Sequence, residues 1–398
     1  MFITLILFWV SLTGLFFSYF GYGILLFLVN RFKRTFSSPK EEKTLNALPA
    51  VTMIIPAYNE RTILEQKIKN TLAIDYPPGL LKIVFVTDGS TDGSELVIRK
   101  YPSLLLLHQP ERQGKMAAIK RAMQQVQSPV VVFSDANAML DKECIQKMIR
   151  HYSDPKTGGV AGEKKIMNPK DGSSIGAAEG IYWSYESFMK KQDAAFNTVV
   201  GAAGELYSIR TELFPRIEDN VILDDFVISM KVCLRGYKIR YEPGAFATEL
   251  PSASLGEERK RKIRISAGAC QSIAYLRNAL NIFKYPVLSF QYISRRLLRW
   301  VLCPPLLIVL LLTNILIVMA DSSHAGYTFF LIAQLFFYLS AITGWLIMRR
   351  TRRGKKMTVL TIPFYFVFMN VCQVIGFIKY LKGKQTVLWE KSMRQPIE

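Results

Sequence analysis

The chain contains four long stretches that carry no Asp, Glu, Lys or Arg. Each is rich in Leu, Ile, Val and Phe, and a single helix needs about 20 such residues to cross the apolar core of a bilayer. The stretches are Phe2–Asn30, Trp300–Ala320, Ala325–Met348 and Thr358–Ile378. The pattern predicts a retained anchor at the amino end and three membrane segments at the carboxyl end.

Basic residues beside these stretches predict the orientation of the chain, because Lys and Arg near a span tend to stay on the cytoplasmic side. They cluster at 31–34, 295–299 and 349–356. We therefore expect a multi-pass protein of the plasma membrane with its amino terminus outside and residues 31–299 in the cytosol. Lysines directly beyond the fourth stretch conflict with a full fourth crossing, which favours a kinked or re-entrant segment. The side of the membrane on which the tail lies stays open.

The region between the membrane segments begins with short apolar runs that alternate with helical periodicity, which is typical of an α/β fold with a largely parallel sheet. The apolar runs predict strands at Val51–Ile55, Ile83–Val86, Leu104–Leu107 and Val130–Phe133. The periodic segments predict helices at Asn59–Ala73, Asp92–Lys100 and Lys115–Val126. Ligands of such sheets bind beyond the carboxyl ends of the strands, where we look for functional residues.

Composition and charge exclude several classes of protein. Half of the residues are hydrophobic, which rules out a disordered chain. Much of the net charge of +20 lies beside the membrane stretches, so membrane lipid is an expected partner and nucleic acid is not. The five cysteines form no C-x-x-C pair and the three histidines share no ligand spacing, so we predict neither a disulfide framework nor a zinc site.

Polar motifs follow three of the predicted strands. They are P-A-Y-N-E at 56–60, T-D-G-S-T-D-G-S at 87–94 and S-D-A-N at 134–137. Asp88, at a strand end, is placed to accept hydrogen bonds from a base or a ribose, and Asp135 with Asn137 offers two oxygens to one Mg2+ or Mn2+ ion. Each motif alone is also explained by a tight turn or a helix cap. No Walker or dinucleotide-binding glycine loop is present.

Two further motifs lie in the second half of this region. Gly201–Arg210 is rich in small residues, which allow a ligand close to the backbone but also suit a simple turn. Leu223–Phe226 places two aspartates at the start of an amphipathic helix that runs to Leu234. Paired acids at a helix start also favour the helix dipole, so the pair alone does not define a site.

The order of these motifs resembles the membrane-bound, inverting family 2 glycosyltransferases of the GT-A (Rossmann-like) fold, in the group of poly-β-1,6-N-acetylglucosamine, cellulose and hyaluronan synthases. The resemblance covers about residues 48–300. It implies a nucleotide site formed by Glu60, Asp88, Lys115 and Asp135. It also implies a metal site at Asp135 and Asn137, where many members carry a second aspartate.

The same resemblance implies a catalytic centre and an acceptor side. Asp225 would be the general base, and the residues near the acceptor and the diphosphate would be Gly204, Glu205, Asp224, Arg261 and Arg264. Arg261 and Ile265 replace the glutamine and the tryptophan of the Q-x-x-R-W motif of processive members, which leaves processivity open, and this basic run is also explained as a phospholipid-facing surface. Trp389 and Arg394 resemble a gating segment.

These patterns divide the chain into consecutive parts. We expect an anchor (1–30), a basic linker (31–48), a cytosolic GT-A domain (49–282), an interfacial helix (283–299), a three-segment membrane region (300–378) and a tail with a possible gating role (379–398).

The resemblance implies transfer from a UDP-hexose or UDP-N-acetylhexosamine, with inversion and with Mg2+ or Mn2+, to a growing polysaccharide. Two alternatives stay open: transfer of a single sugar to a lipid acceptor, and a catalytically silent subunit that scaffolds a partner.

Overall fold

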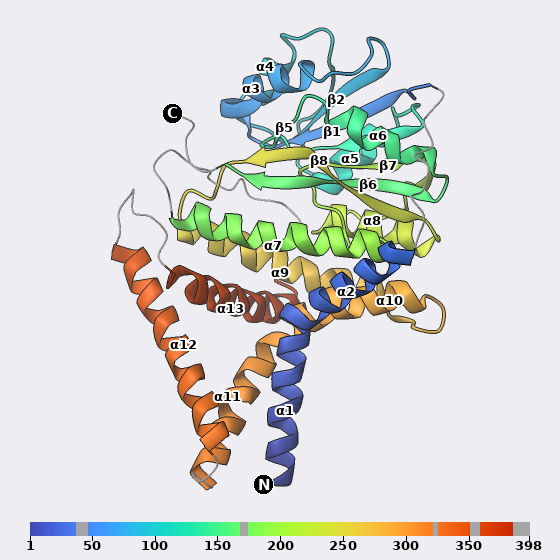
Figure 1. Cartoon of the computed structure of the whole chain (residues 1–398). Coiled ribbons are helices and arrows are strands. Elements are labelled where there is room, and N and C mark those ends of the chain that lie inside the picture. Colours follow the sequence, from blue (N-terminus) through green and yellow to red (C-terminus); the bar gives the residue numbers. More distant parts are fainter. Residues whose placement is uncertain (37–46, 168–173, 321–324, 351–358, 385–398) are drawn as a thin grey trace.

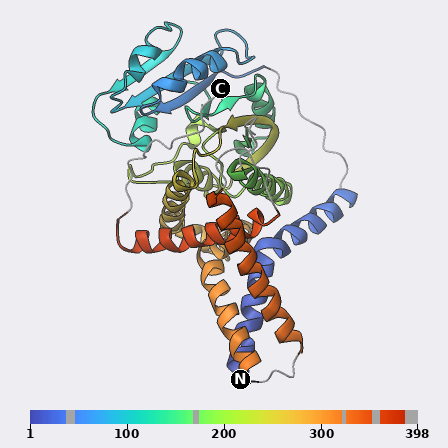
Figure 2. The same ribbon diagram turned by 90° about the vertical axis from the view of Figure 1, so that its left-hand side faces the viewer.

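The protein consists of an α/β unit that rests on a group of long apolar helices (Figure 1). The computed structural model describes residues 1–36, 47–167, 174–320, 325–350 and 359–384. Three helices, α1 (Phe2–Phe16), α11 (Cys303–Ala320) and α12 (Ala325–Arg350), project away from the α/β unit on one side, as two perpendicular views show (Figures 1 and 2).

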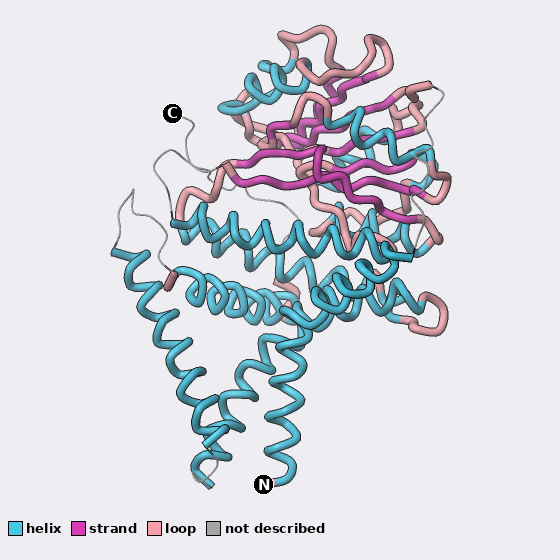
Figure 3. Tube along the Cα trace, in the orientation of Figure 1, coloured by secondary structure: helices cyan, strands magenta, loops and turns pink. Residues whose placement is uncertain are grey.

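A mixed sheet forms the centre of the α/β unit, and within the described residues it has eight strands in the order β3-β2-β1-β4-β7-β6-β8-β5 (Figure 3). The strands are β1 (Val51–Ala57), β2 (Leu81–Asp88), β3 (Leu105–Gln109), β4 (Val130–Phe133), β5 (Met139–Leu140), β6 (Thr157–Ile166), β7 (Tyr207–Arg210) and β8 (Lys238–Glu249). Strands β3, β2, β1 and β4 are parallel, whereas β7 runs antiparallel to both of its neighbours.

The parallel half of the sheet matches the predicted elements. All residues of β1 and β4 are buried, which explains their unbroken apolar sequences. The strands alternate with α3 (Arg61–Leu72), α4 (Ser94–Ile98) and α5 (Lys115–Met123). All four predicted strands and all three predicted helices are confirmed, with ends that differ by no more than three residues. The carboxyl ends of β1, β2 and β4 therefore carry the three polar motifs on one edge of the sheet.

Two long helices, α7 (Ser174–Phe196) and α9 (Leu255–Tyr275), lie between the sheet and the apolar helices (Figure 1). An ion pair between Arg261 and Glu179 joins them. The shorter helices of the unit are α6 (Cys144–Ile149), α8 (Asp224–Leu234) and α10 (Pro286–Tyr292). The amphipathic helix predicted after Leu223 is thus confirmed as α8.

Four helices of the described chain are long and apolar enough to cross a membrane: Phe2–Phe36, Pro286–Ala320, Ala325–Arg349 and Thr361–Leu381. The first continues from α1 through a π-helical turn (Phe17–Gly21) into α2 (Tyr22–Phe36). The second begins well before the predicted span, because α10, the π-helical segment η5 (Ile293–Leu302) and α11 form one continuous helix. The segment predicted as a separate interfacial helix is therefore joined directly to the apolar helix that follows it.

The fourth apolar helix, α13 (Thr361–Leu381), lies across the base of the α/β unit at an angle to α11 and α12 (Figures 1 and 2), and it contacts α12, where Phe337 packs on Phe366. It packs closely on α9, since a Cβ atom at Gly376 would lie 2.5 Å from the Cβ of Ser266. The hydroxyl of Tyr365 donates to Glu258 of α9 at 2.9 Å.

A buried ionic cluster joins α2, α7 and η5 at the base of the unit. Glu186 lies 2.7 Å from Arg295 Nη2 and 2.5 Å from Arg299 Nη2. Arg295 Nε also lies 3.2 Å from Asp193, which accepts a hydrogen bond from the Tyr22 hydroxyl. Because these side chains are almost inaccessible to solvent, each charge depends on its partners for stabilisation.

We predict that Arg295→Met lowers the free energy of unfolding by about 3–5 kcal/mol, since it leaves Asp193 buried without its guanidinium partner. Arg277→Met, at an exposed arginine outside the cluster, is the control and should change it by less than about 0.5 kcal/mol. Denaturant unfolding in detergent micelles measures both. Equal stabilities of the two variants would show that the cluster does not hold these helices together.

Candidate active site

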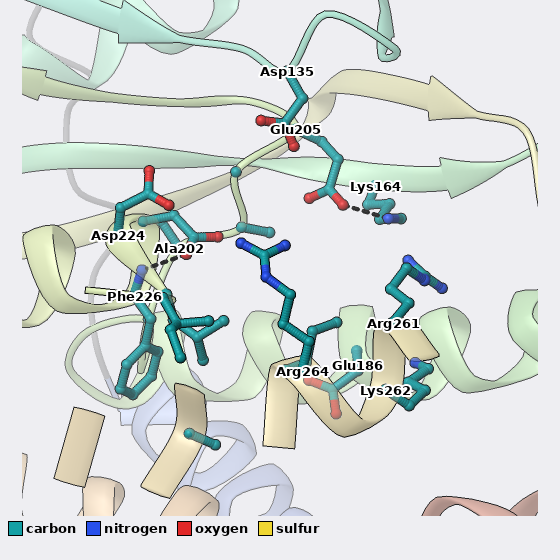
Figure 4. A pocket seen from close by; sticks show the side chains of 18 of the residues that line it. Asp135, Lys164, Glu186, Ala202, Glu205, Asp224, Phe226, Arg261, Lys262 and Arg264 are labelled. Carbon is teal, nitrogen blue, oxygen red and sulfur yellow. Dashed lines mark hydrogen bonds and ion pairs between the residues drawn. The ribbon is translucent and has the colours of Figure 1, made fainter. Parts of the chain in front are cut away.

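A cavity of about 330 Å³ lies at the carboxyl ends of β1 and β4, between the sheet and the helices α7, α9 and η5 (Figure 4). Its wall nearest the sheet includes Glu60 and Asp135, and its opposite end reaches Trp300 of η5 and Gln373 of α13. The cavity therefore extends from the polar strand ends to the apolar helices. Of the predicted site residues, those that line it are Glu60, Lys115, Asp135, Asn137, Gly204, Glu205, Asp224, Asp225, Arg261 and Arg264.

Three carboxylates converge on one ammonium group in this cavity. Lys115 Nζ lies 2.8 Å from Asp135 Oδ1 and 3.5 Å from Asp224 Oδ2. Gly204 lies beside the same groups, because a Cβ atom placed on it would be 3.3 Å from Asp225 Oδ2, 3.3 Å from Lys115 Nζ and 3.4 Å from Asp135 Oδ2. Residues separated by up to 110 positions in the sequence thus meet around a single point.

The environment of Asp225 changes its acidity. Burial and the neighbouring Asp224 carboxylate raise the pKa of Asp225 to about 7, against the opposing effect of Lys115. Its Oδ1 accepts a hydrogen bond from the backbone N–H of Phe226 at 2.8 Å. A carboxylate with such a pKa is a stronger base than an ordinary aspartate and is still ionised in a large fraction of molecules near neutral pH.

The loop before Glu205 is shaped by glycine. Gly201 has φ of 88°, and a Cβ atom there would lie 2.0 Å from the ring of Phe226, so no larger residue fits. The next residue, Ala202, donates its backbone N–H to Ser229 of α8 at 2.9 Å. These contacts fix the small-residue loop against the helix that begins with the paired aspartates.

Asp88 lies behind the cavity wall rather than among the described residues that line it. Its carboxylate is inaccessible to solvent and accepts the backbone N–H groups of Gln113, at 3.1 Å, and of Gly114, at 2.7 Å. These two residues directly precede Lys115, the first residue of α5. In this structure Asp88 thus supports the turn that positions Lys115, and the direct contact with a nucleotide stays a prediction.

A second ionic group, which the sequence patterns did not reveal, lies next to the first. Lys164 of β6 pairs with both Glu205 and Glu249. Asn137 donates its amide nitrogen to the other oxygen of Glu249 at 2.7 Å. Lys164 and Glu249 stand in no recognisable motif, and they meet only because β6 and β8 pair in the sheet. The predicted role of Asn137 as a metal ligand is not tested by this contact.

Two predicted arginines of α9 differ in their surroundings. Arg261 pairs with Glu179 and with Glu258. Arg264 points into the cavity towards Asp135 and Asp224 (Figure 4). Within the described part of the chain its Nε has no hydrogen-bond partner. Burial disfavours the charged form of this side chain and so lowers the pKa of Arg264. Arg264 is therefore the better placed of the two to bind an anionic ligand.

Some predicted residues are not described by the structure, and the sequence patterns missed others. Trp389 and Arg394, the predicted gating residues, lie outside the described residues. The sequence patterns did not single out Lys67, which is fully buried beneath the S-D-A-N motif and donates to Ser134 at 2.8 Å. They also missed Trp183 and Lys190, which line the cavity from α7. An isolated charged residue inside a helical pattern gives no signal that distinguishes it from a solvent-exposed one.

Parts of the chain are similar to known proteins. Residues 52–216 match the sequence model of Glycosyl transferase family 2. The chain is 28% identical over 259 residues to a poly-β-1,6-N-acetyl-D-glucosamine synthase of Staphylococcus aureus (strain COL), a match that covers 62% of this chain and 61% of the relative. A synthase of the same description from Staphylococcus epidermidis is 25% identical over 226 residues, covering 55% of this chain and 54% of the relative. The chain thus spans about three fifths or less of the length of these curated relatives.

Among solved structures, the mannosyltransferase PcManGT from Pyrobaculum calidifontis in complex with GDP-Man and Mn2+ superposes with a TM-score of 0.69 at 21% identity. The match covers 95% of this chain and 100% of that one. At this level of identity the likeness establishes the fold, which is that of GT-A glycosyltransferases. The expected resemblance to family 2 glycosyltransferases is confirmed, and it rests on residues 52–216, which are less than half of the chain.

Proposed function

We propose that the protein transfers a sugar from a UDP-hexose or UDP-N-acetylhexosamine, with inversion, to a growing polysaccharide at the cytosolic face of the plasma membrane. The observation that carries this proposal is the convergence of Asp135, Asp225 and Lys115 around Gly204 in one cavity. The description of the curated relatives as poly-β-1,6-N-acetyl-D-glucosamine synthases supports a polysaccharide product and an N-acetylhexosamine donor.

In the proposed reaction Asp225 takes the proton of the acceptor hydroxyl while the oxygen attacks the anomeric carbon. A sugar hydroxyl is a weak acid, so the attack needs a base close to the forming bond. The raised pKa of Asp225, about 7, supports this role, because the carboxylate binds a proton strongly yet is ionised in many molecules at neutral pH. A single displacement inverts the anomeric centre, so an α-linked donor gives a β-linked product.

The leaving diphosphate gains negative charge during this step and needs cationic groups nearby. Arg264, which points into the cavity, and Lys115, which lies beside Asp135, are the side chains that we assign to this charge. Removing one such stabilising group typically costs about 2.7–4 kcal/mol of activation free energy. We assign Glu60 and Asp88 to the nucleotide side, and Glu205 and Asp224 to the acceptor side. We assign Arg261, which pairs with Glu179 of α7, to holding α9 against α7.

The residues of the cavity fit a divalent cation. Asp135 and the buried Asp224 offer carboxylate oxygens to the cavity, and no hydrogen bond to Asp224 Oδ2 is found within the described residues. No group of three or more His, Cys, Asp or Glu side chains in the described chain could hold a metal by itself. This agrees with Mg2+ or Mn2+, which is commonly bound by one or two carboxylates together with substrate phosphates. Asp135, with Asn137 beside it, would hold the ion, which when bound neutralises charge on the diphosphate.

We also propose the expected division of the chain, with an anchor at 1–30, a GT-A domain at 49–282 and a membrane region at 300–378. The basic clusters at 31–34 and 295–299 support a cytosolic GT-A domain.

The alternative of a silent scaffold subunit is less well supported, because a scaffold does not need three converging carboxylates. Release of UDP from a series of nucleotide sugars by the purified protein, with and without Mn2+ or Mg2+, tests the proposal, and no release from any of them would refute it.

Replacing the proposed base should stop transfer without loss of donor binding. We expect Asp225→Asn to lower kcat by about 10²–10⁴-fold, since the amide cannot accept the proton, while Kd for UDP changes less than about threefold. Initial rates and calorimetric titration with UDP measure the two quantities. Exposed Asp219→Asn, close in sequence but outside the cavity lining, is the matched control. Full activity of Asp225→Asn would exclude this residue as the base.

The raised pKa of Asp225 predicts a pH dependence of the rate. The base acts only when ionised, so kcat/KM should be constant above about pH 7 and fall about tenfold per pH unit below it. Because the Asp224 carboxylate contributes to the shift, Asp224→Asn should move the midpoint to lower pH. A wild-type profile that is flat from pH 5 to 8, or a midpoint that rises in the variant, would contradict the assignment.

Gly204→Ala should disturb the reaction more than the fold. Its Cβ would press on the ends of three side chains at 3.3–3.4 Å, and these ends can move by a few tenths of an ångström at little cost in stability. Displacing reacting groups by about 1 Å can lower a rate by ~10²-fold, so a shift of a few tenths of an ångström should lower kcat by about two- to tenfold. Gly180→Ala, where a Cβ meets nothing within 4 Å, is the control. Equal rates for both variants would show that the space beside Gly204 is not used.

A further inference from the structure

One charged residue on the buried face of α7 differs from its neighbours. The acids of this face have arginine partners: Glu179 pairs with Arg261, and Glu186 and Asp193 pair with Arg295. Lys190 is only 3% exposed, and no hydrogen bond from its Nζ is found in the described ranges of the chain. A buried ammonium without a hydrogen-bond acceptor is costly, so a ligand that supplies an acceptor at this position would be stabilised.

Lys190 lines the cavity together with Trp183, which lies seven residues earlier on α7. Its ammonium lies 5.6 Å from the ring centre of Trp183 and 5.9 Å from that of Tyr241. The indole Nε1 of Trp183 is also buried without an acceptor among the described residues. Two hydrogen-bond donors and an aromatic surface thus lie together on one wall of the cavity.

The charges around Lys190 indicate which ligand class fits. Three carboxylates, those of Glu163, Glu205 and Glu186, interact favourably with the ammonium, yet burial, together with the nearby Arg296, lowers the pKa of Lys190. Two of these carboxylates already have cationic partners, since Glu205 pairs with Lys164 and Glu186 pairs with arginines of η5. A phosphate group would add negative charge to this balanced group and would be repelled by its carboxylates. A neutral ligand with many hydroxyl groups avoids this repulsion, since it can accept hydrogen bonds from the ammonium and the indole, donate to a carboxylate and pack on an aromatic ring.

The position of these groups connects them with the proposed transfer step. Glu205 interacts with Lys190, and its preceding neighbour Gly204 lies beside Asp225 and Asp135. A ligand on Trp183 and Lys190 therefore lies on the side of the cavity that adjoins the proposed base. We propose that Trp183 and Lys190 form a subsite for a neutral sugar unit of the acceptor, an inference that rests on the proposed function and favours a glycan over a lipid phosphate as the acceptor.

Steady-state kinetics with two acceptors tests this subsite. The first acceptor is a β-linked N-acetylglucosamine trimer and the second is a polyprenyl phosphate in detergent, each with the nucleotide sugar that the wild-type protein uses. We expect transfer to the trimer, and we expect Lys190→Met and Trp183→Phe to raise its KM at least about tenfold while the KM for the nucleotide sugar changes less than twofold. Lys191→Met, at the exposed neighbour on the same helix, is the control and should leave both values unchanged.

Two outcomes would overturn the subsite: an unchanged KM for the trimer in both variants, or transfer by the wild type to the polyprenyl phosphate alone. Calorimetric titration of the full-length protein with the trimer, without any nucleotide sugar, separates this failure from that of the proposed function. If the wild type turns over no nucleotide sugar, the proposed function fails. The subsite is still supported in that case if the wild type binds the trimer and both variants bind it more weakly. No binding of the trimer by the wild type, in a protein that does release UDP, refutes the subsite alone.

Discussion

The contact of one lysine with several carboxylates sets the charge balance of the cavity. Acidic side chains that are buried close together repel one another, and a cation among them is needed to keep them ionised. Lys115 provides that cation: burial disfavours its charge, but Asp135, Asp224 and Asp225 outweigh this effect and raise its pKa above the ordinary value. The balance is incomplete at Asp225, whose pKa stays raised, and this residual imbalance favours its proposed role as the base.

The surrounding structure maintains this balance from two directions. On the sheet side, Asp88 accepts the backbone N–H groups that precede Lys115 and so fixes the start of α5. On the opposite side, the buried cluster around Glu186 joins α7 to the apolar helix that contains Arg295 and Arg299. The cavity lies between these two supports and reaches from the strand ends to α13. In the proposed reaction, donor and acceptor would therefore meet where the α/β unit adjoins the apolar helices.

The sequence predicted those features that depend on local patterns. Buried parallel strands have unbroken apolar sequences, so Val130–Phe133 was identified at its exact ends, and the polar residues after β1, β2 and β4 pointed to the correct edge of the sheet. Features that arise from long-range pairing were missed. Lys164 meets Glu249 only through the pairing of β6 with β8, and Lys190 becomes a cavity residue only because α7 lies beneath the sheet. The buried position of Asp88 was also not predictable, because a turn motif does not indicate on which side of the sheet edge its carboxylate lies.

The central claim is that one cavity contains both the leaving diphosphate and the base. A structure of the protein with UDP and Mn2+ tests it most directly. The account predicts that the diphosphate lies within contact distance of Arg264 and that Mn2+ is bound to Asp135, with the Asp225 carboxylate facing the same space. Binding of UDP at a place remote from Asp135, or a carboxylate of Asp225 directed away from the bound nucleotide, would contradict the account.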